Sequence, residues 1–417
     1  MASSVERAAR ASRSPFRPGI LAILGLVIVM AMALRIGLFD FESGDYRVFL
    51  SPWYDFIVGN GQFRALGYEF SNYSPPYLYL LTLATYLPLP KLYAVKLISV
   101  SFDFLLALFV LLIVRLKYDH RVVWASSFFA ALFAPTVFIN SALWGQSDAS
   151  YTSMLVASVY FAIRQRSNWS LFFFSVALSF KLQAVFLFPL FVVLLLKRRV
   201  SSYSFLIIPV TYMVSILPTW LAGRPMVELL MTYPAQTRQF SELTLNASNL
   251  YQWLPKDAGL LEKPGLVLAA LLAGLLCLAV WRSAVPLGGD VILKLSLVST
   301  LLLPFTLPHM HERYFFPADV VSIVYAFYSP KRFFVPLIVG VASLLSYFPF
   351  LFREALIDLR YPAVLMGIAL VVAAADLIRS LYPSSSYRPR YERVPDYLEH
   401  RREGDQPHRL RRSRPGL

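Results

Sequence analysis

Apolar residues occur along this 417-residue chain as long unbroken runs separated by short polar stretches. The runs are continuous, whereas the strands of a membrane β-barrel alternate apolar and polar residues over about ten positions. A helix needs about 20 apolar residues to cross a bilayer, and the recurring runs predict helices of this kind. The pattern therefore predicts an all-α polytopic membrane protein.

We expect a bundle of about 12 transmembrane helices, one at each run of sufficient length. Two of them are short and lie between residues 169 and 196, with a turn near "FKLQA". The other spans are expected at residues 19–38, 92–114, 122–140, 151–163, 205–221, 265–281, 291–307, 315–327, 333–350 and 362–378.

The apolar segment between Pro76 and Pro88 is too short for a comfortable crossing, and we interpret it as an interfacial helix in the first outer loop. Lys and Arg concentrate in cytoplasmic loops. If the segment crossed the membrane, the basic stretches "RLKYDHR", "RQRS" and "KRR" would not all lie on the cytoplasmic side. Charge placement thus favours the interfacial interpretation, with both chain ends in the cytoplasm.

Three parts of the chain follow from this topology. Residues 1–18 are expected to form a basic cytoplasmic N-terminus, and residues 19–380 the membrane domain. Residues 381–417 lack an apolar run and are rich in arginine, which predicts a disordered basic cytoplasmic tail.

Composition supports the membrane class and limits the alternatives. The chain is 57% hydrophobic with a mean hydropathy of +0.58, so its net charge of +15 is better explained by orientation in a membrane than by nucleic-acid binding. Its single cysteine, Cys277, rules out an intramolecular disulfide and a thiolate metal cluster.

Polar stretches gather on the predicted outer face. An ionisable group near hydrocarbon costs about 2.5–3.5 kcal/mol on insertion scales, which favours a function or a partner for each. We expect a shared site there, with independent anchoring of helix ends as the alternative. The stretches are residues 40–45, "WGQSD" with Asp148, Lys181, "TLNASNLYQWLP" and "HMHERY".

Several familiar site types are not supported by the motifs. "HERYF" begins like the zinc motif H-E-x-x-H, but Phe315 occupies the position of the second histidine. A Gly-x-Ser-x-Gly nucleophile elbow is missing from the sequence. His309 and His311 lie two residues apart, which leaves a divalent cation open without defining a metal site.

Six stretches, spread in order over residues 40–320, together resemble the GT-C superfamily of membrane glycosyltransferases. The similarity is closest to the mannosyltransferases of GPI-anchor synthesis and their bacterial relatives. The stretches are "SGDYRVF", "NYSPPYLYLL", "ALWGQSDASYTSML", "SFKLQAVFLFP", "NASNLYQWLP" and "LPHMHERYFFP".

The resemblance implies a GT-C-like fold and inverting transfer of a hexose, mannose first, from a polyprenyl-phosphate donor to an acceptor hydroxyl. The acceptor would be a glycan, a lipid or a protein. GPI-type enzymes often carry Asp-x-Asp in the first outer loop, where this chain reads Ser43-Gly44-Asp45. The departure leaves Asp45 as the principal acid and does not support a metal held by two neighbouring acids.

Such a transfer needs a base for the acceptor proton and cations for the departing phosphate. We expect Asp45 to act as the base, with Asp148 positioning the acceptor or the sugar. A helix cap is the structural alternative for either carboxylate. The residues expected to bind phosphate or substrate are Arg313, Lys181, His309, His311, Glu312, Arg47, Gln146 and Asn249.

Two other classes stay open on the sequence. One is a transporter or flippase for a lipid-linked or anionic solute, and the other is a membrane glycan polymerase or ligase with a diphosphate-linked donor. The expected compartment is the bacterial plasma membrane, with the endoplasmic reticulum membrane as the alternative.

Overall fold

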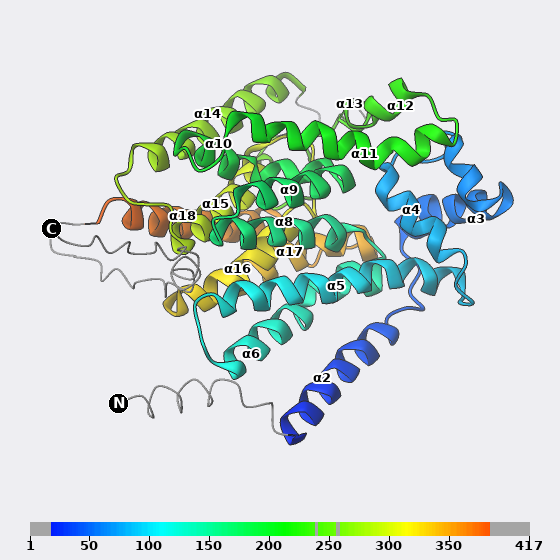
Figure 1. The fold of residues 1–417 in the computed structure, drawn as a ribbon, viewed down its shortest axis with the longest axis horizontal. Helices are drawn as coiled ribbons and strands as arrows, with labels where there is room; N and C mark the ends of the chain where they lie inside the picture. The colour runs from blue at the N-terminus through cyan, green and yellow to red at the C-terminus, as the bar shows by residue number, and fades with distance from the viewer. Residues whose placement is uncertain (1–17, 238–240, 256–258, 384–417) are drawn as a thin grey trace, which may run out of the picture. The chain divides into compact units, whose positions relative to one another are not determined.

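A computed structural model describes residues 18–237, 241–255 and 259–383 of the chain. Helices form almost all of its regular structure, which confirms the predicted all-α class (Figure 1). Residues 1–17 and 384–417, which hold most of the predicted basic N-terminus and disordered tail, lie outside the described residues.

The helices and strands follow one another in chain order, with α for α-helices and η for 3-10 and π-helices. Up to residue 200 they are α2 (Pro18–Ile36), η1 (Tyr46–Leu50), α3 (Ser51–Gly59), η2 (Gln62–Gly67), α4 (Pro75–Ala84), α5 (Lys91–Arg115), α6 (Arg121–Leu132), α7 (Pro135–Phe138), η3 (Ile139–Trp144), α8 (Asp148–Ile163), α9 (Ser167–Phe180), η4 (Leu182–Leu187) and α10 (Phe188–Leu196). Beyond it they are η5 (Ser202–Leu206), α11 (Ile207–Leu221), α12 (Met226–Leu230), α13 (Thr232–Gln236), β1 (Thr244–Leu245), η6 (Leu250–Trp253), η7 (Gly259–Leu261), α14 (Glu262–Arg282), α15 (Gly289–Thr306), β2 (Met310–His311), α16 (Phe316–Tyr328), η8 (Pro330–Arg332), α17 (Phe334–Phe352) and α18 (Arg360–Leu381).

The predicted spans coincide with helices, but the predicted number of about 12 spans is not confirmed. Among the described residues, six helices are long and apolar enough to cross a membrane, or seven if one bent pair is a single span. They are compatible with a multi-pass membrane protein. The six cover Lys91–Arg115, Ser202–Leu221, Gly259–Arg282, Gly289–Thr306, Pro330–Phe352 and Arg360–Leu381.

Several other apolar helices are shorter than a bilayer is thick. α9 has 14 residues and α16 has 13. At a rise of 1.5 Å per residue, each is about 20 Å long, against about 30 Å of hydrocarbon. Apolar composition alone therefore does not separate these short helices from full-length ones. The segment around Pro76 forms α4, a helix of 10 residues, as its length predicted.

The predicted span at residues 122–140 is a bent pair. α6 ends at Leu132, and α7 with η3 continues at an angle of 45°. Pro135 explains the break, because proline lacks a backbone N–H and disfavours helical geometry in the residue before it. The bend directs the π-helix η3, with Asn140 and Trp144, toward the start of α8.

α8 lies at the centre of the bundle, between α5 and α9 and in contact with α15 and α16 (Figure 1). All of its side chains from Asp148 to Val159 are buried. Its many small residues let the neighbouring helices approach closely. Ser158 and Ser170 each donate a hydrogen bond to the other's carbonyl oxygen, at 2.9 and 2.8 Å, and so join α8 to α9.

A buried ion pair holds the first described helix to the bundle. Arg35 Nε of α2 donates to Asp103 Oδ2 of α5 at 2.8 Å, and both side chains are completely buried. Arg35 Nη2 also donates to the carbonyl oxygen of Leu132, and Ser141 Oγ donates to Asp103 Oδ2 at 2.5 Å. The pair therefore connects α2, α5, α6 and η3.

Lys96 of α5 fixes the segment that leads from α2 to Asp45. Its ammonium group donates to the carbonyl oxygens of Leu38, Phe39 and Phe41 at 3.1, 2.9 and 2.6 Å. A lysine ammonium has three donors, and all three are used here. The buried charge is thus solvated by backbone carbonyls instead of by water.

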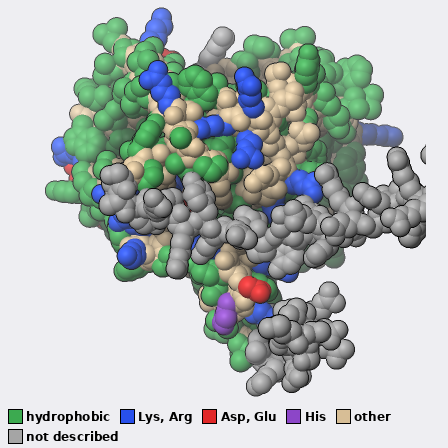
Figure 2. Space-filling view, turned by 60° about the vertical axis from the view of Figure 1, so that its left-hand side comes forward, with side chains coloured by type: hydrophobic (Ala, Val, Ile, Leu, Met, Phe, Trp, Pro, Cys, Tyr) green, Lys and Arg blue, Asp and Glu red, His purple; other side chains and the backbone are tan. Residues whose placement is uncertain are grey.

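The two ends of the bundle differ in chemistry. At one end lie Asp148, Lys181 and Arg313, and we call it the site end. Helices α8 and α16 begin there, and helices α9 and α15 end there. The opposite end, which we call the basic end, carries Lys and Arg side chains among hydrophobic ones (Figure 2). Such an enrichment is what the positive-inside rule predicts for a cytoplasmic side. Its basic residues include Arg115, Arg164, Arg198, Arg199, Arg282 and Lys331.

The ion pair at Arg35 can be tested by removing one partner and then both. Arg35→Met leaves the Asp103 carboxylate buried without its cation, and we expect it to lower the free energy of unfolding by about 3–5 kcal/mol. Arg35→Met combined with Asp103→Leu removes both charges and should recover most of that loss. Thermal unfolding in detergent measures both. Equal losses in the single and double variants would contradict this role for the pair.

Candidate functional site

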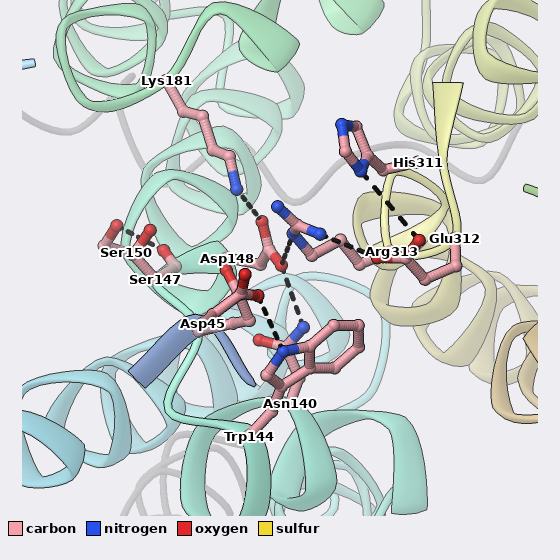
Figure 3. A network of polar contacts seen from close by, with 11 residues as sticks. Asp45, Asn140, Trp144, Ser147, Asp148, Ser150, Lys181, His311, Glu312 and Arg313 are labelled. Carbon is pink, nitrogen blue, oxygen red and sulfur yellow. Dashed lines mark hydrogen bonds and ion pairs between the residues drawn. The ribbon is translucent and has the colours of Figure 1, made fainter. Parts of the chain in front are cut away.

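Asp148 lies at the first turn of α8 and is completely buried. Lys181 donates to its Oδ1, and Asn140 Nδ2 donates to its Oδ2 at 2.9 Å. Arg313 Nε lies 3.7 Å from the same Oδ2 (Figure 3). Three separate segments, η3, the α9–η4 junction and the loop after β2, thus converge on one carboxylate.

Asp45 is oriented through one of its two carboxylate oxygens. Trp144 Nε1 donates to Oδ2 at 2.9 Å (Figure 3). Gln146 Nε2 donates to the same atom. Ser43 Oγ donates to the carbonyl oxygen of Trp144 at 2.7 Å, which fixes the loop just before Asp45. Among the described residues, no donor contacts Oδ1. Asp45 is half-buried and lines a cavity, so this oxygen is available to a ligand.

Gly145 connects Trp144 to Gln146, the two donors to Asp45. Its φ of +80° lies in the left-handed region, which suits glycine at the C-terminus of a helix. The turn that presents Trp144 and Gln146 to Asp45 therefore depends on a glycine at this position.

The loop after β2 supplies one cation, Arg313, and one acid, Glu312, on the other side of the cavity. β1 and β2 pair in parallel, with Leu245 opposite His311. The amide of Glu312 donates to the carbonyl oxygen of Leu245 at 3.0 Å. This pairing places Arg313, whose Nη1 donates to Glu312 Oε1 at 2.7 Å.

Trp144 contacts both sides of the site. Its N–H donates to Asp45, and the guanidinium carbon of Arg313 lies 5.5 Å from the centre of its ring. A guanidinium over an indole face is attracted by the ring's quadrupole. Trp144 itself is completely buried and stacks on Phe350. It therefore connects the candidate base to the candidate phosphate ligand.

The site holds both cations and carboxylates, in similar numbers. The cations Lys181 and Arg313 face the carboxylates of Asp45, Asp148 and Glu312. His311 adds no charge, because burial and the nearby Arg313 and Lys181 lower its pKa to about 2. Burial raises the pKa of Glu312 to about 7, against the opposing effect of Arg313.

A cavity of about 880 Å³ adjoins these residues. Asp45, Lys181, His311, Glu312 and Arg313 line it, which fulfils the expectation that distant segments share one site. Leu266, 45% exposed, also lines it and belongs to α14, most of whose sides are exposed. The apolar lining includes Phe49, Leu50, Phe180, Leu182, Phe186 and Leu266.

His309 also lines the cavity, with Nδ1 2.7 Å from the carbonyl oxygen of Glu242 and Nε2 3.7 Å from Glu262. Two other predicted site residues have other positions. The structure does not place Arg47 or Asn249 in the cavity lining. Arg47 is exposed and pairs with Glu42 at 3.1 Å, and the buried Asn249 side chain accepts from the amide of Tyr251 at the start of η6.

The sequence reasoning missed Asn140 and did not assign Trp144 to the site. Both lie on η3, and a π-helix gives no periodic pattern that a sequence reveals. In the described part of the chain, no three His, Cys, Asp or Glu side chains are grouped to hold a metal ion.

Comparison with known proteins yields no match, either to a family model or to a curated protein. The resemblance to GT-C enzymes therefore stays a prediction from the six sequence stretches.

Matched Asp→Asn changes should separate the two aspartates. Asp148→Asn removes the buried charge that Lys181 and Arg313 share, and we expect it to lower the free energy of unfolding by about 3–5 kcal/mol. Asp45→Asn changes a half-buried side chain whose amide oxygen can still accept from Trp144 and Gln146, so it should cost about 1 kcal/mol or less. Thermal unfolding in detergent compares them. Similar losses in both variants would contradict this division of roles.

Proposed function

We propose that this protein is an integral membrane glycosyltransferase of GT-C type, which moves a hexose, mannose first, from a polyprenyl-phosphate donor to an acceptor hydroxyl. The observation that carries the proposal is the open Oδ1 of Asp45 in the same cavity as Lys181 and Arg313. A carboxylate held through one oxygen keeps the other ready to accept a proton.

The reaction assigns one task to each group. The acceptor hydroxyl attacks the anomeric carbon and transfers its proton to Asp45 Oδ1. The bond between that carbon and the phosphate oxygen breaks, and the polyprenyl phosphate leaves with the bonding electrons. Arg313, as a planar fork, and Lys181, as a point charge, stabilise the departing phosphate. One in-line displacement of this kind inverts the anomeric configuration.

The cavity is of a suitable kind for such a donor. Ligand cavities typically measure about 300–1,000 Å³, and this one combines a few charged groups with apolar lining. Leu266 of α14 is part of the cavity lining, so the cavity reaches this helix. The exposed apolar side chains of α14 suit contact with lipid. A polyprenyl tail would extend in that direction. The acceptor, a glycan, lipid or protein hydroxyl, would approach on the Asp45 side.

Asp148 has a different role in this scheme from the positioning of the acceptor or the sugar that the sequence predicted. Both of its oxygens already accept hydrogen bonds, from Lys181 and Asn140. It therefore holds Lys181 near the phosphate position instead of taking up the acceptor proton. We propose Asp45 as the catalytic base and Asp148 as a positioning residue.

Transport of a lipid-linked or anionic solute is the competing proposal. The buried charges of Arg35, Lys96 and Asp103 lie within helices, as such charges do in transporters. Each of them is paired or hydrogen-bonded, and none lines the cavity. This arrangement fits a structural role, and the glycosyltransferase accounts for more of the site.

Sugar transfer is the direct test. Purified protein in liposomes receives radiolabelled polyprenyl-phosphate mannose or glucose, with and without chelator, together with lipid and glycan extracts of membranes. We expect covalent transfer of label, and a loss of about 10²–10⁴-fold in Asp45→Asn, because the base is removed. The matched control is Asp55→Asn, since Asp55 is exposed and pairs with Lys91.

Two results would refute the proposal. Full activity of Asp45→Asn would exclude Asp45 as the base. Uptake of label into the liposomes without any covalent product would favour the transporter.

A further inference from the structure

Glu312 is a buried acid whose cation partner is also the best phosphate ligand of the site. Its side chain is 1% exposed, and Arg313 Nη1 lies 2.7 Å from its Oε1. His311 Nδ1 lies 4.0 Å from the other oxygen, but His311 is neutral at ordinary pH because its pKa is lowered to about 2. Arg313 is therefore the group that compensates a charge on Glu312.

An arriving anion competes with Glu312 for this arginine. The titratable groups that interact with Glu312 are Arg313 beside it, Asp45 from the first loop, and the neutral phenols of Tyr314 and Tyr347. With Glu312 ionised, the buried part of the site holds two cations, Arg313 and Lys181, and the three carboxylates of Asp45, Asp148 and Glu312, and a phosphate would add to the excess of negative charge. Protonation of Glu312 removes one of these negative charges before the anion binds, whereas the exposed Glu242 and Glu262 of the cavity lining stay in contact with water.

Holding an unpaired carboxylate in a buried position is costly, and such groups become protonated instead. We propose that Glu312 takes up a proton when a phosphodiester anion binds beside Arg313, so that binding at this site is coupled to proton uptake. The inference rests on the proposed phosphodiester donor. The proton comes from solvent and resides on a Glu312 oxygen, and Arg313 turns its N–H groups from that oxygen to the phosphate.

The pH window follows from the pKa of Glu312. In the ligand-free protein it is about 7, and loss of Arg313 to the anion raises it further. Below pH 7, Glu312 is already protonated and affinity does not depend on pH. Above it, affinity falls by up to about tenfold per pH unit, with uptake of about half a proton near pH 7 and nearly one near pH 8.

Calorimetry with a non-titrating ligand tests the coupling. The probe is farnesyl methyl phosphate, a diester that stays monoanionic over this range. It is titrated into the full chain in detergent micelles at pH 6 and pH 8, in two buffers of different ionisation enthalpy. We expect proton uptake at pH 8, little at pH 6, and affinity up to about tenfold weaker at pH 8.

Two variants locate the proton. Glu312→Gln keeps the shape of the side chain without a titrating group, so it should bind the diester without proton uptake and about equally well at both pH values. The matched control is Glu262→Gln, because Glu262 lines the same cavity but is half exposed at its rim. It should keep the proton uptake of the unmodified protein.

The inference fails if the unmodified protein binds without proton uptake, if uptake persists in Glu312→Gln, or if the diester does not bind. Weaker binding of Glu312→Gln at both pH values would instead make Glu312 a fixed support for Arg313. Sugar transfer is measured separately. Transfer without proton uptake would overturn only this inference, and proton-coupled binding without transfer would overturn only the proposed function.

Discussion

Asp148 is a completely buried carboxylate, and its charge needs partners that the helices around it must supply. Lys181, Asn140 and Arg313 reach it from segments far apart in the chain. An isolated charge at this position would cost several kcal/mol, so the fold and this cluster depend on one another. Breaks in the helices allow this arrangement. α9 ends at Phe180, directly before Lys181, and the bend at Pro135 turns Asn140 toward α8.

A second set of contacts positions Asp45 against this fixed cluster. Lys96 holds the carbonyl oxygens of the segment before it, and Ser43 ties the same loop to Trp144. Trp144 then contacts Asp45 with its N–H and Arg313 with its ring. Such fixed geometry is what a base and a phosphate site need if they are to act on the same bond. These contacts hold Asp45 by its Oδ2 and leave its Oδ1 available to a ligand in the cavity.

The sequence predicted the all-α class, the positions of the helices and the convergence of Asp45, Lys181 and Arg313, because apolar runs and charge placement carry that information. The predicted number of about 12 spans is not confirmed, and short helices such as α16 have the same apolar composition as long ones. The burial of Glu312 was not predictable, since it depends on the contact between β1 and β2. The donors on η3 were not predictable, because the π-helix arises from tertiary packing.

The central claim is that one cavity at the site end holds a sugar phosphate between Asp45 and the two cations. A cryo-electron microscopy structure with a non-hydrolysable polyprenyl phosphonate sugar tests it most directly. The account predicts phosphonate oxygens in contact with Arg313 and Lys181, and the anomeric carbon facing Asp45 Oδ1. Ligand density at the basic end, or in the cavity with its sugar directed away from Asp45, would contradict it.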